Sequence, residues 1–163
     1  MPLQLVTELT AGDEALLRRA VDGFLPASIF DIHAHLFHAR HFAAGSRPAF
    51  IEADRGHGLR EYGAAMARWM PGRTVEGLFF GYPSAGNNRP GENAWLREQL
   101  APVADATSSR ALVLAAPEDD PDEVRQLLTG GIFIGIKPYR LYANVPDTRE
   151  APIESFAPEW MWE

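Results

Sequence analysis

The strongest constraint on the fold is an alternation of two kinds of segment along the chain. Short apolar runs typical of strands alternate with segments whose apolar residues recur at helical spacing. The expected strands cover residues 28–37, 75–82, 110–117 and 131–139, and the expected helices cover residues 11–24, 58–70, 94–104 and 121–129. Strands that alternate with helices predict an α/β fold with a parallel sheet.

Local signals mark the ends of several elements. Asp120 is expected to cap the last of these helices, with Pro121 at its first position. The segment 87–93, NNRPGEN, has the composition of a turn, and residues 140–152 are expected to form a loop. The final segment, 153–163, predicts the beginning of a further helix.

Two architectures are compatible with this alternation. A doubly wound nucleotide-binding sheet should have a glycine-rich turn after its first strand, and the segment here, HLFHARHFAAG, has no such motif. A barrel of βα units carries its catalytic groups at the carboxyl ends of its strands. The histidine-bearing loop after the first expected strand therefore favours the barrel.

Composition excludes several classes of function. The formal net charge of −7 argues against nucleic acid or an anionic membrane as the main partner. The chain contains no cysteine, so disulfides and thiolate metal sites are excluded. No apolar run approaches the roughly 20 residues of a membrane helix, and the N-terminus lacks the features of a signal peptide. We therefore expect a soluble, cytoplasmic protein.

The first expected strand carries Asp31, His33 and His35 at every second position. Side chains alternate faces along a strand, so these three are expected to point the same way, opposite to Ile32 and Ala34. Unpaired polar groups inside a sheet or barrel are costly, and a divalent cation bound by the imidazoles would remove that cost. The alternative interpretation is that the histidines are ordinary core residues with hydrogen-bond partners.

The segment FDIHAHLF resembles the DxHxH motif on the first strand of the amidohydrolase superfamily, especially its amidohydrolase-related branch. The segment GIFIGIKPYR resembles the fourth strand of that branch, which ends in a lysine, here Lys137. The two motifs occur in the family's order, separated by two expected βα units. The resemblance covers about residues 28–163, which would be the first four βα units of a (β/α)8 TIM barrel, preceded by a helical segment over residues 1–27.

This resemblance implies a metal-dependent hydrolase that uses a divalent metal, most readily zinc. His33 and His35 would be metal ligands, Asp31 the acidic member of the motif, and Lys137 a catalytic residue or a substrate contact. A metal-activated water would attack an amide, ester or lactone carbonyl of a small molecule. Non-oxidative decarboxylation, known in the same branch, is an alternative, and a metal-dependent phosphoesterase is a weaker one.

Further candidates follow the expected strands. His38 and His41 lie in the loop after the first strand, where they could contact substrate or simply face solvent. Tyr139 and Arg140 follow Lys137, and Arg140 could bind a substrate carboxylate or be a surface charge.

The resemblance is to half a barrel only. Members of the branch are more than twice as long, and their remaining ligands and general base come from later strands. An isolated half barrel would leave two strand edges unpaired. We therefore expect a fragment of a longer enzyme, a homo-oligomer, or a partner chain that completes the barrel. A catalytically incompetent half barrel that acts as an assembly or binding module is the alternative.

Overall fold

A sheet of four parallel strands forms the centre of the computed structural model, which describes residues 9–51 and 54–162. The strands are β1 (Ser28–His35), β4 (Thr74–Phe80), β5 (Arg110–Ala115) and β6 (Phe133–Pro138). They lie in the order β1-β4-β5-β6, so each strand after β1 is paired with the sheet strand that precedes it along the chain. The predicted α/β fold with a parallel sheet is confirmed.

One helix connects each pair of neighbouring strands. These helices are α2 (Leu59–Trp69), α3 (Arg89–Leu100) and α4 (Pro121–Leu128), and α1 (Ala11–Ala20) precedes the sheet. A short antiparallel pair, β2 (Phe37–His38) and β3 (Gly56–His57), follows β1. Single 3₁₀ turns complete the fold: η1 (Ala39–His41), η2 (Arg140–Tyr142), η3 (Thr148–Glu150), η4 (Ile153–Ser155) and η5 (Glu159–Met161). No helix of the described part is long and apolar enough to cross a membrane.

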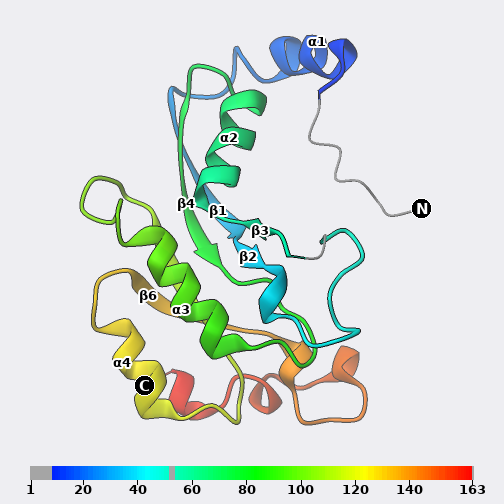
Figure 1. The fold of residues 1–163 in the computed structure, drawn as a ribbon, viewed down its shortest axis with the longest axis vertical. Coiled ribbons are helices and arrows are strands. Elements are labelled where there is room, and N and C mark those ends of the chain that lie inside the picture. Colours follow the sequence, from blue (N-terminus) through cyan, green and yellow to red (C-terminus); the bar gives the residue numbers. More distant parts are fainter. Residues whose placement is uncertain (1–8, 52–53, 163) are drawn as a thin grey trace.

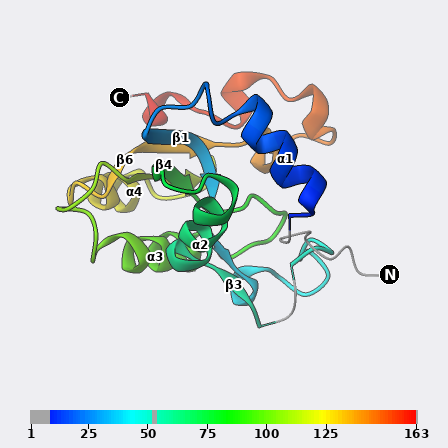
Figure 2. The same ribbon diagram turned by 90° about the horizontal axis from the view of Figure 1, so that it is seen from above.

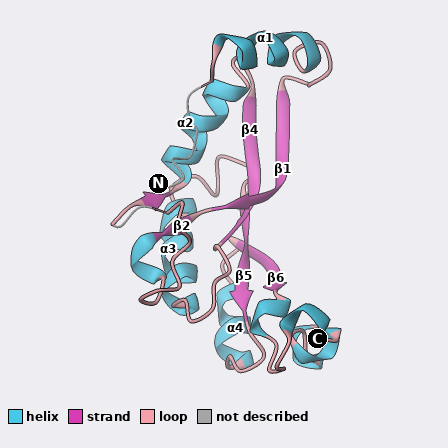
Figure 3. Cartoon of the chain, turned by 90° about the vertical axis from the view of Figure 1, so that its right-hand side faces the viewer, coloured by secondary structure: helices cyan, strands magenta, loops and turns pink. Residues whose placement is uncertain are grey.

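The main core lies between the sheet and its three connecting helices. A single buried cluster joins strand residues to residues of α2, α3 and α4, with these members: Ala34, Leu36, Tyr62, Phe79, Trp95, Leu96, Leu100, Ala111, Val113, Ala115, Val124 and Phe133. Ala111, Val113 and Ala115 alternate along β5, so this cluster covers one face of that strand. Figures 2 and 3 agree in placing α2 and α3 on the same side of β1 and β4.

Large apolar side chains remain exposed on the two outer strands of the sheet. Phe30 and Ile32 of β1 are 43% and 75% exposed, and Ile134 of β6 is 59% exposed. β1 and β6 end the sheet, because each is paired with one neighbour only in the four-stranded order. Both outer strands therefore carry apolar side chains that the described residues leave exposed.

The helix α1 does not pack as its sequence suggests. The amphipathic pattern over residues 11–24 predicts a buried apolar stripe, but no residue of α1 is buried, and Leu16 is 52% exposed. Phe24, which follows the helix, is 84% exposed. Figure 1 shows α1 at the end of the molecule opposite to α4. The helix forms nevertheless, since Thr10 and Asp13 make a reciprocal capping box.

Several boundaries differ from the sequence-based expectation, and α1, expected over residues 11–24, already ends at Ala20. The helix α3 begins at Arg89 rather than near Ala94, because the Asn88 side chain caps it by accepting a hydrogen bond from the Gly91 amide at 3.0 Å. The expected turn over residues 87–93 is thus largely the start of this helix. The final segment forms η4 and η5 instead of an α-helix, and Pro158 precedes η5, where a proline disfavours helical continuity.

Candidate functional site

The strand β1 does not keep the strict alternation expected from its sequence. Asp31 pairs with Gly77 and Ala34 pairs with Phe79, so three steps along β1 match two steps along β4. This irregularity is a β-bulge, which bends the strand and changes which way its side chains point. The residues on either side of the bulge therefore cannot be assigned to faces by counting in twos.

The Asp31 carboxylate is held toward the helical layer. Its Oδ2 accepts a hydrogen bond from the Tyr62 hydroxyl of α2 at 3.0 Å, and Ala34 belongs to the same buried cluster as Tyr62. Its Oδ1 accepts the backbone amide of His33 at 3.0 Å. The expectation that Asp31 points the same way as His33 and His35 is thus wrong. Asp31 instead fixes the backbone of the strand just before the histidines.

His33 and His35 lie side by side against one aromatic ring. Their ring centroids are 5.3 Å apart at an interplanar angle of 70°. The ring of Phe80, at the carboxyl end of β4, lies 4.8 Å from the ring of His33 and 4.7 Å from that of His35. Phe80 is fully buried, so its ring is an apolar surface against which both imidazoles pack.

Lys137 of β6, at the opposite edge of the sheet, lies over the same Phe80 ring. Its Nζ lies 4.7 Å from the centre of the Phe80 ring and 5.7 Å from that of Tyr139. The carboxyl ends of β1, β4 and β6 thus bring two imidazoles and one amine to a single aromatic ring. Parallel strands carry functional groups at these ends in many α/β enzymes.

The orientation of the His35 ring is fixed by a backbone carbonyl. Its Nδ1 lies 3.0 Å from the carbonyl oxygen of Gly81, which can only accept, so the neutral ring carries its proton on Nδ1. The Nε2 lone pair is then available to a ligand. Burial lowers the pKa of His35, the Gly81 bond opposes this, and the nearby His33 and Lys137 lower the pKa further.

This arrangement fits part of a metal site. A neutral imidazole whose other nitrogen is tied to a carbonyl is the usual form of a zinc-binding histidine. A catalytic zinc ion takes three protein ligands, and within residues 9–51 and 54–162 no group of three or more His, Asp or Glu side chains is placed to hold a metal. Among the described residues, no third imidazole or carboxylate therefore stands with His33 and His35 in such a group.

The other residues predicted for the site lie in different places. Tyr139 borders Lys137, and its buried hydroxyl has no hydrogen-bond partner among the described residues. Arg140 is exposed, and its guanidinium donates to the carbonyl of Arg149 at 3.3 Å. The ring of His38 lies 5.9 Å from that of Trp95 of α3, and its Nδ1 accepts the amide of Arg40. Among these residues, Tyr139 is the one that contacts Lys137.

A buried pair that the sequence did not indicate lies behind the histidines. His41 and Glu92 have side chains 7% and 1% exposed, and His41 Nδ1 contacts Glu92 Oε2 directly. The pKa of His41 is lowered to about 4, mainly by burial and in addition by the nearby Arg40 and His38. Burial also raises the pKa of Glu92 to about 8, while the amides of His38 and Tyr82 favour its charged form. His41 is therefore not the solvent-exposed loop residue that its sequence context allows.

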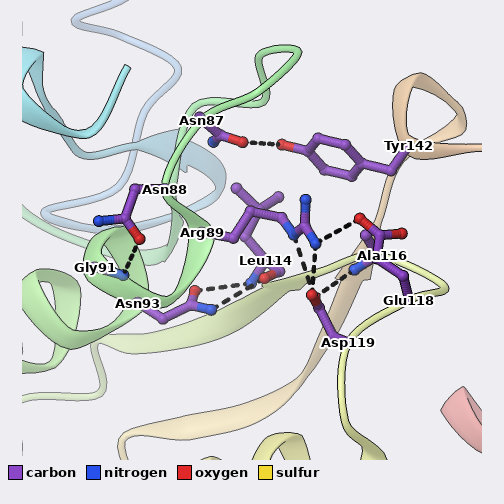
Figure 4. A network of polar contacts seen from close by, with 10 residues as sticks. All are labelled: Asn87, Asn88, Arg89, Gly91, Asn93, Leu114, Ala116, Glu118, Asp119 and Tyr142. Atoms are coloured by element: carbon purple, nitrogen blue, oxygen red, sulfur yellow. Dashed lines mark hydrogen bonds and ion pairs between the residues drawn. The ribbon is translucent and has the colours of Figure 1, made fainter. Parts of the chain in front are cut away.

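A second network ties together the loops after β4, β5 and β6 (Figure 4). The Arg89 guanidinium donates to Asp119 and Glu118, and its centre lies 4.9 Å above the ring of Tyr142. The Tyr142 hydroxyl donates to Asn87 Oδ1 at 3.1 Å. This network fixes the rim of the sheet on the side where His33, His35 and Lys137 lie.

Comparisons with protein-family models, with curated proteins and with solved structures found no match.

Proposed function

We propose that this chain provides the first half of a metal-dependent hydrolase of the amidohydrolase-related type. The observation that carries the proposal is the convergence of His33, His35 and Lys137 on the Phe80 ring. These are the same residues on which the two sequence motifs place the family's metal ligands and strand-end lysine. This convergence and the two motifs together support the proposal.

The strand order supports a half barrel over a doubly wound sheet. Each sheet strand is added next to the preceding one, and the order does not reverse within the described residues. A doubly wound sheet reverses its order at a switch point and carries helices on both faces. Here α2, α3 and α4 share one buried cluster with the strands. This pattern is typical of consecutive units of a (β/α)8 barrel.

In this proposal His33 and His35 would hold the metal through one ring nitrogen each, while Gly81 keeps the second nitrogen of His35 occupied. A zinc ion held there would supply a Lewis acid and would lower the pKa of a bound water. Lys137 provides a positive charge beside the imidazoles, suited to orient a carboxylate or carbonyl oxygen of the substrate. Phe80 excludes water from beneath the site. The remaining ligands and the general base would come from a completing segment or chain.

The substrates we propose are small amides, esters or lactones. Non-oxidative decarboxylation is the alternative reaction of the same site, because a substrate carboxylate could be held by Lys137 and the metal. The two reactions are separated by their products, since only the second releases carbon dioxide.

The test is elemental analysis of protein purified without chelators, followed by a hydrolysis panel of esters, lactones and amides. We expect zinc or a similar divalent metal in the wild type, and loss of that metal in His33→Ala and His35→Ala. Wild-type protein without divalent metal, before and after reloading, would contradict the proposal. Turnover that is unchanged in both variants would contradict it equally.

A second candidate function is assembly, and the exposed apolar residues favour it. Phe30, Ile32 and Ile134 lie on the two outer strands, whose edges the described residues leave unpaired. A second copy or a partner chain would cover this surface. Sedimentation velocity should detect a species larger than the monomer, and Ile32→Glu should shift it toward the monomer. A wild type that is monomeric at all accessible concentrations would exclude self-assembly.

A further inference from the structure

The buried His41–Glu92 pair joins two segments far apart in the sequence. His41 ends η1, in the loop that follows β1, and Glu92 lies in the first turn of α3. The backbone reinforces the junction, since the amide of Asn88 donates to the carbonyl of His41 at 2.6 Å. The loop after β1 is thus fastened to the start of α3 at one buried point.

Arg40 determines which nitrogen of His41 carries the proton. Its Nε donates to His41 Nε2 at 3.0 Å, so that nitrogen is an acceptor and is unprotonated. The proton of the neutral ring is then on Nδ1, which faces Glu92 Oε2. The three residues form a chain of hydrogen bonds from the Arg40 guanidinium through the imidazole to Oε2 of Glu92.

Glu92 also lies directly behind the peptide that orients His35. A Cβ atom added to Gly81 would be 2.6 Å from Glu92 Cγ and 3.5 Å from Glu92 Cδ. The Glu92 side chain therefore packs against the Cα of Gly81. The carbonyl of that same residue accepts the Nδ1 proton of His35 at 3.0 Å. The position of the Glu92 side chain is consequently coupled to the direction of the Gly81 carbonyl.

We propose that Glu92 and His41 are positioning residues for His35. By fastening the loop after β1 to α3, the pair fixes the Gly81 peptide, and the Gly81 carbonyl keeps the His35 proton on Nδ1 and its Nε2 free for a ligand. The inference deepens the proposed metal-dependent function and rests on it for the identity of the ligand. The tautomer of His35 does not depend on any metal.

The experiment compares Glu92→Leu, which fills the space without an acceptor, with Glu92→Gln, which keeps an oxygen for the His41 proton. Glu98→Leu is the matched control, because Glu98 lies exposed on the same helix. Long-range ¹H–¹⁵N correlation spectra of the metal-free protein report the His35 tautomer. We expect Nδ1–H in the wild type, in Glu92→Gln and in Glu98→Leu, and a mixture of tautomers in Glu92→Leu.

Zinc affinity is the second readout. Loss of a residue that positions a ligand should weaken zinc binding by about tenfold or more in Glu92→Leu, with little change in Glu92→Gln and Glu98→Leu. His41→Phe serves the same purpose if Glu92→Leu does not fold. A folded variant with pure Nδ1–H on His35 and unchanged zinc affinity would overturn the inference. If the wild type binds no zinc, the proposed function fails, and the tautomer alone decides the positioning role.

Discussion

The Nδ1 atom of His35 and the carbonyl oxygen of Gly81 are 3.0 Å apart, and this contact links the end of β1 to the end of β4. It fixes the plane of one imidazole in the group formed by His33, His35 and Lys137. Because the acceptor is a backbone atom, its position depends on the packing around the Gly81 peptide, where Glu92 leaves no room for a Cβ atom.

Replacement of Gly81 tests that packing. In Gly81→Ala the new Cβ would lie 2.6 Å from Glu92 Cγ, closer than Cβ atoms come to their neighbours in folded proteins, and 3.3 Å from Leu114 Cδ2, which is a tight contact. We expect a loss of about 1–3 kcal/mol in the free energy of unfolding, measured by urea denaturation.

Gly63→Ala is the matched control for Gly81→Ala. Gly63 lies within α2, and a Cβ atom there would have no neighbour within 4 Å. Alanine favours a helix interior by about 1 kcal/mol over glycine, so this variant should be more stable than the wild type. Equal effects of the two substitutions would show that the space behind Gly81 is not limiting.

The hydrogen bond from Tyr62 to Asp31 should contribute measurably to stability. It joins α2 to β1 beside the bulge, and its acceptor is a carboxylate. We expect Tyr62→Phe to lower the free energy of unfolding by about 1.5 kcal/mol, the usual magnitude for a bond to a charged group. A double-mutant cycle with Asp31→Asn should show coupling between the two positions, and strictly additive effects would mean that the bond contributes nothing.

The same bond predicts an alkaline pH dependence. Burial raises the pKa of Tyr62 above its usual value of 10.0, and Asp31 raises it further. Above pH 10 the unfolded chain therefore releases this proton first, and the stability of the folded state falls as the pH rises. Denaturation at pH 9 and pH 11 should show a smaller loss in Tyr62→Phe than in the wild type. An identical loss in both proteins would argue against a raised pKa.

His41 should remain neutral well below the pH at which histidines usually titrate. Burial, together with the nearby Arg40 and His38, lowers its pKa from 6.5 to about 4. The unfolded chain therefore binds this proton first as the pH falls, so His41 lowers stability between about pH 6.5 and pH 4. An NMR titration should place the midpoint of the assigned His41 ring near 4 in the folded protein and near 6.5 in urea. A folded-state midpoint at or above 6.5 would contradict the buried, Arg40-facing ring.

The network around Arg89 should stabilise more than an exposed ion pair does. Asp119 accepts from the Arg89 guanidinium and from the Ala116 amide at 2.8 Å, and both charged side chains are mostly buried. We expect Asp119→Ala to cost about 2 kcal/mol, between the values typical of exposed and buried pairs. Glu14→Ala, which removes an exposed pair with Arg18, should cost no more than about 0.5 kcal/mol. If the two variants lose similar amounts of free energy of unfolding, the Arg89 network stabilises the fold no more than an exposed ion pair does.

The local pattern of the sequence predicted most of the fold. Alternating strand and helix segments define the parallel sheet and its connecting helices because their periodicities are set by residues close together in the chain. The cap at Asp120 with Pro121 at the first helical position is confirmed for the same reason. The start of α3 was misplaced because Asn88 and Pro90 suit a turn and a helix start equally well.

Features that depend on long-range contacts could not be read from the sequence. The bulge in β1 is a register relationship with β4, and it changes the face of Asp31 without any local signal. His41 and Glu92 are 51 positions apart, so nothing near either residue indicates their contact. The exposure of α1 likewise depends on what the rest of the molecule places beside it, which an amphipathic pattern does not specify.

The most direct test of the account is calorimetric titration of chelator-stripped protein with zinc. His33→Ala and His35→Ala are compared with the wild type, and His57→Ala is the control, because His57 stacks on Phe37 instead of Phe80. We predict saturable zinc binding in the wild type and in His57→Ala, and binding weaker by about tenfold or more in His33→Ala and His35→Ala. Zinc affinities that are the same in all four proteins would contradict it.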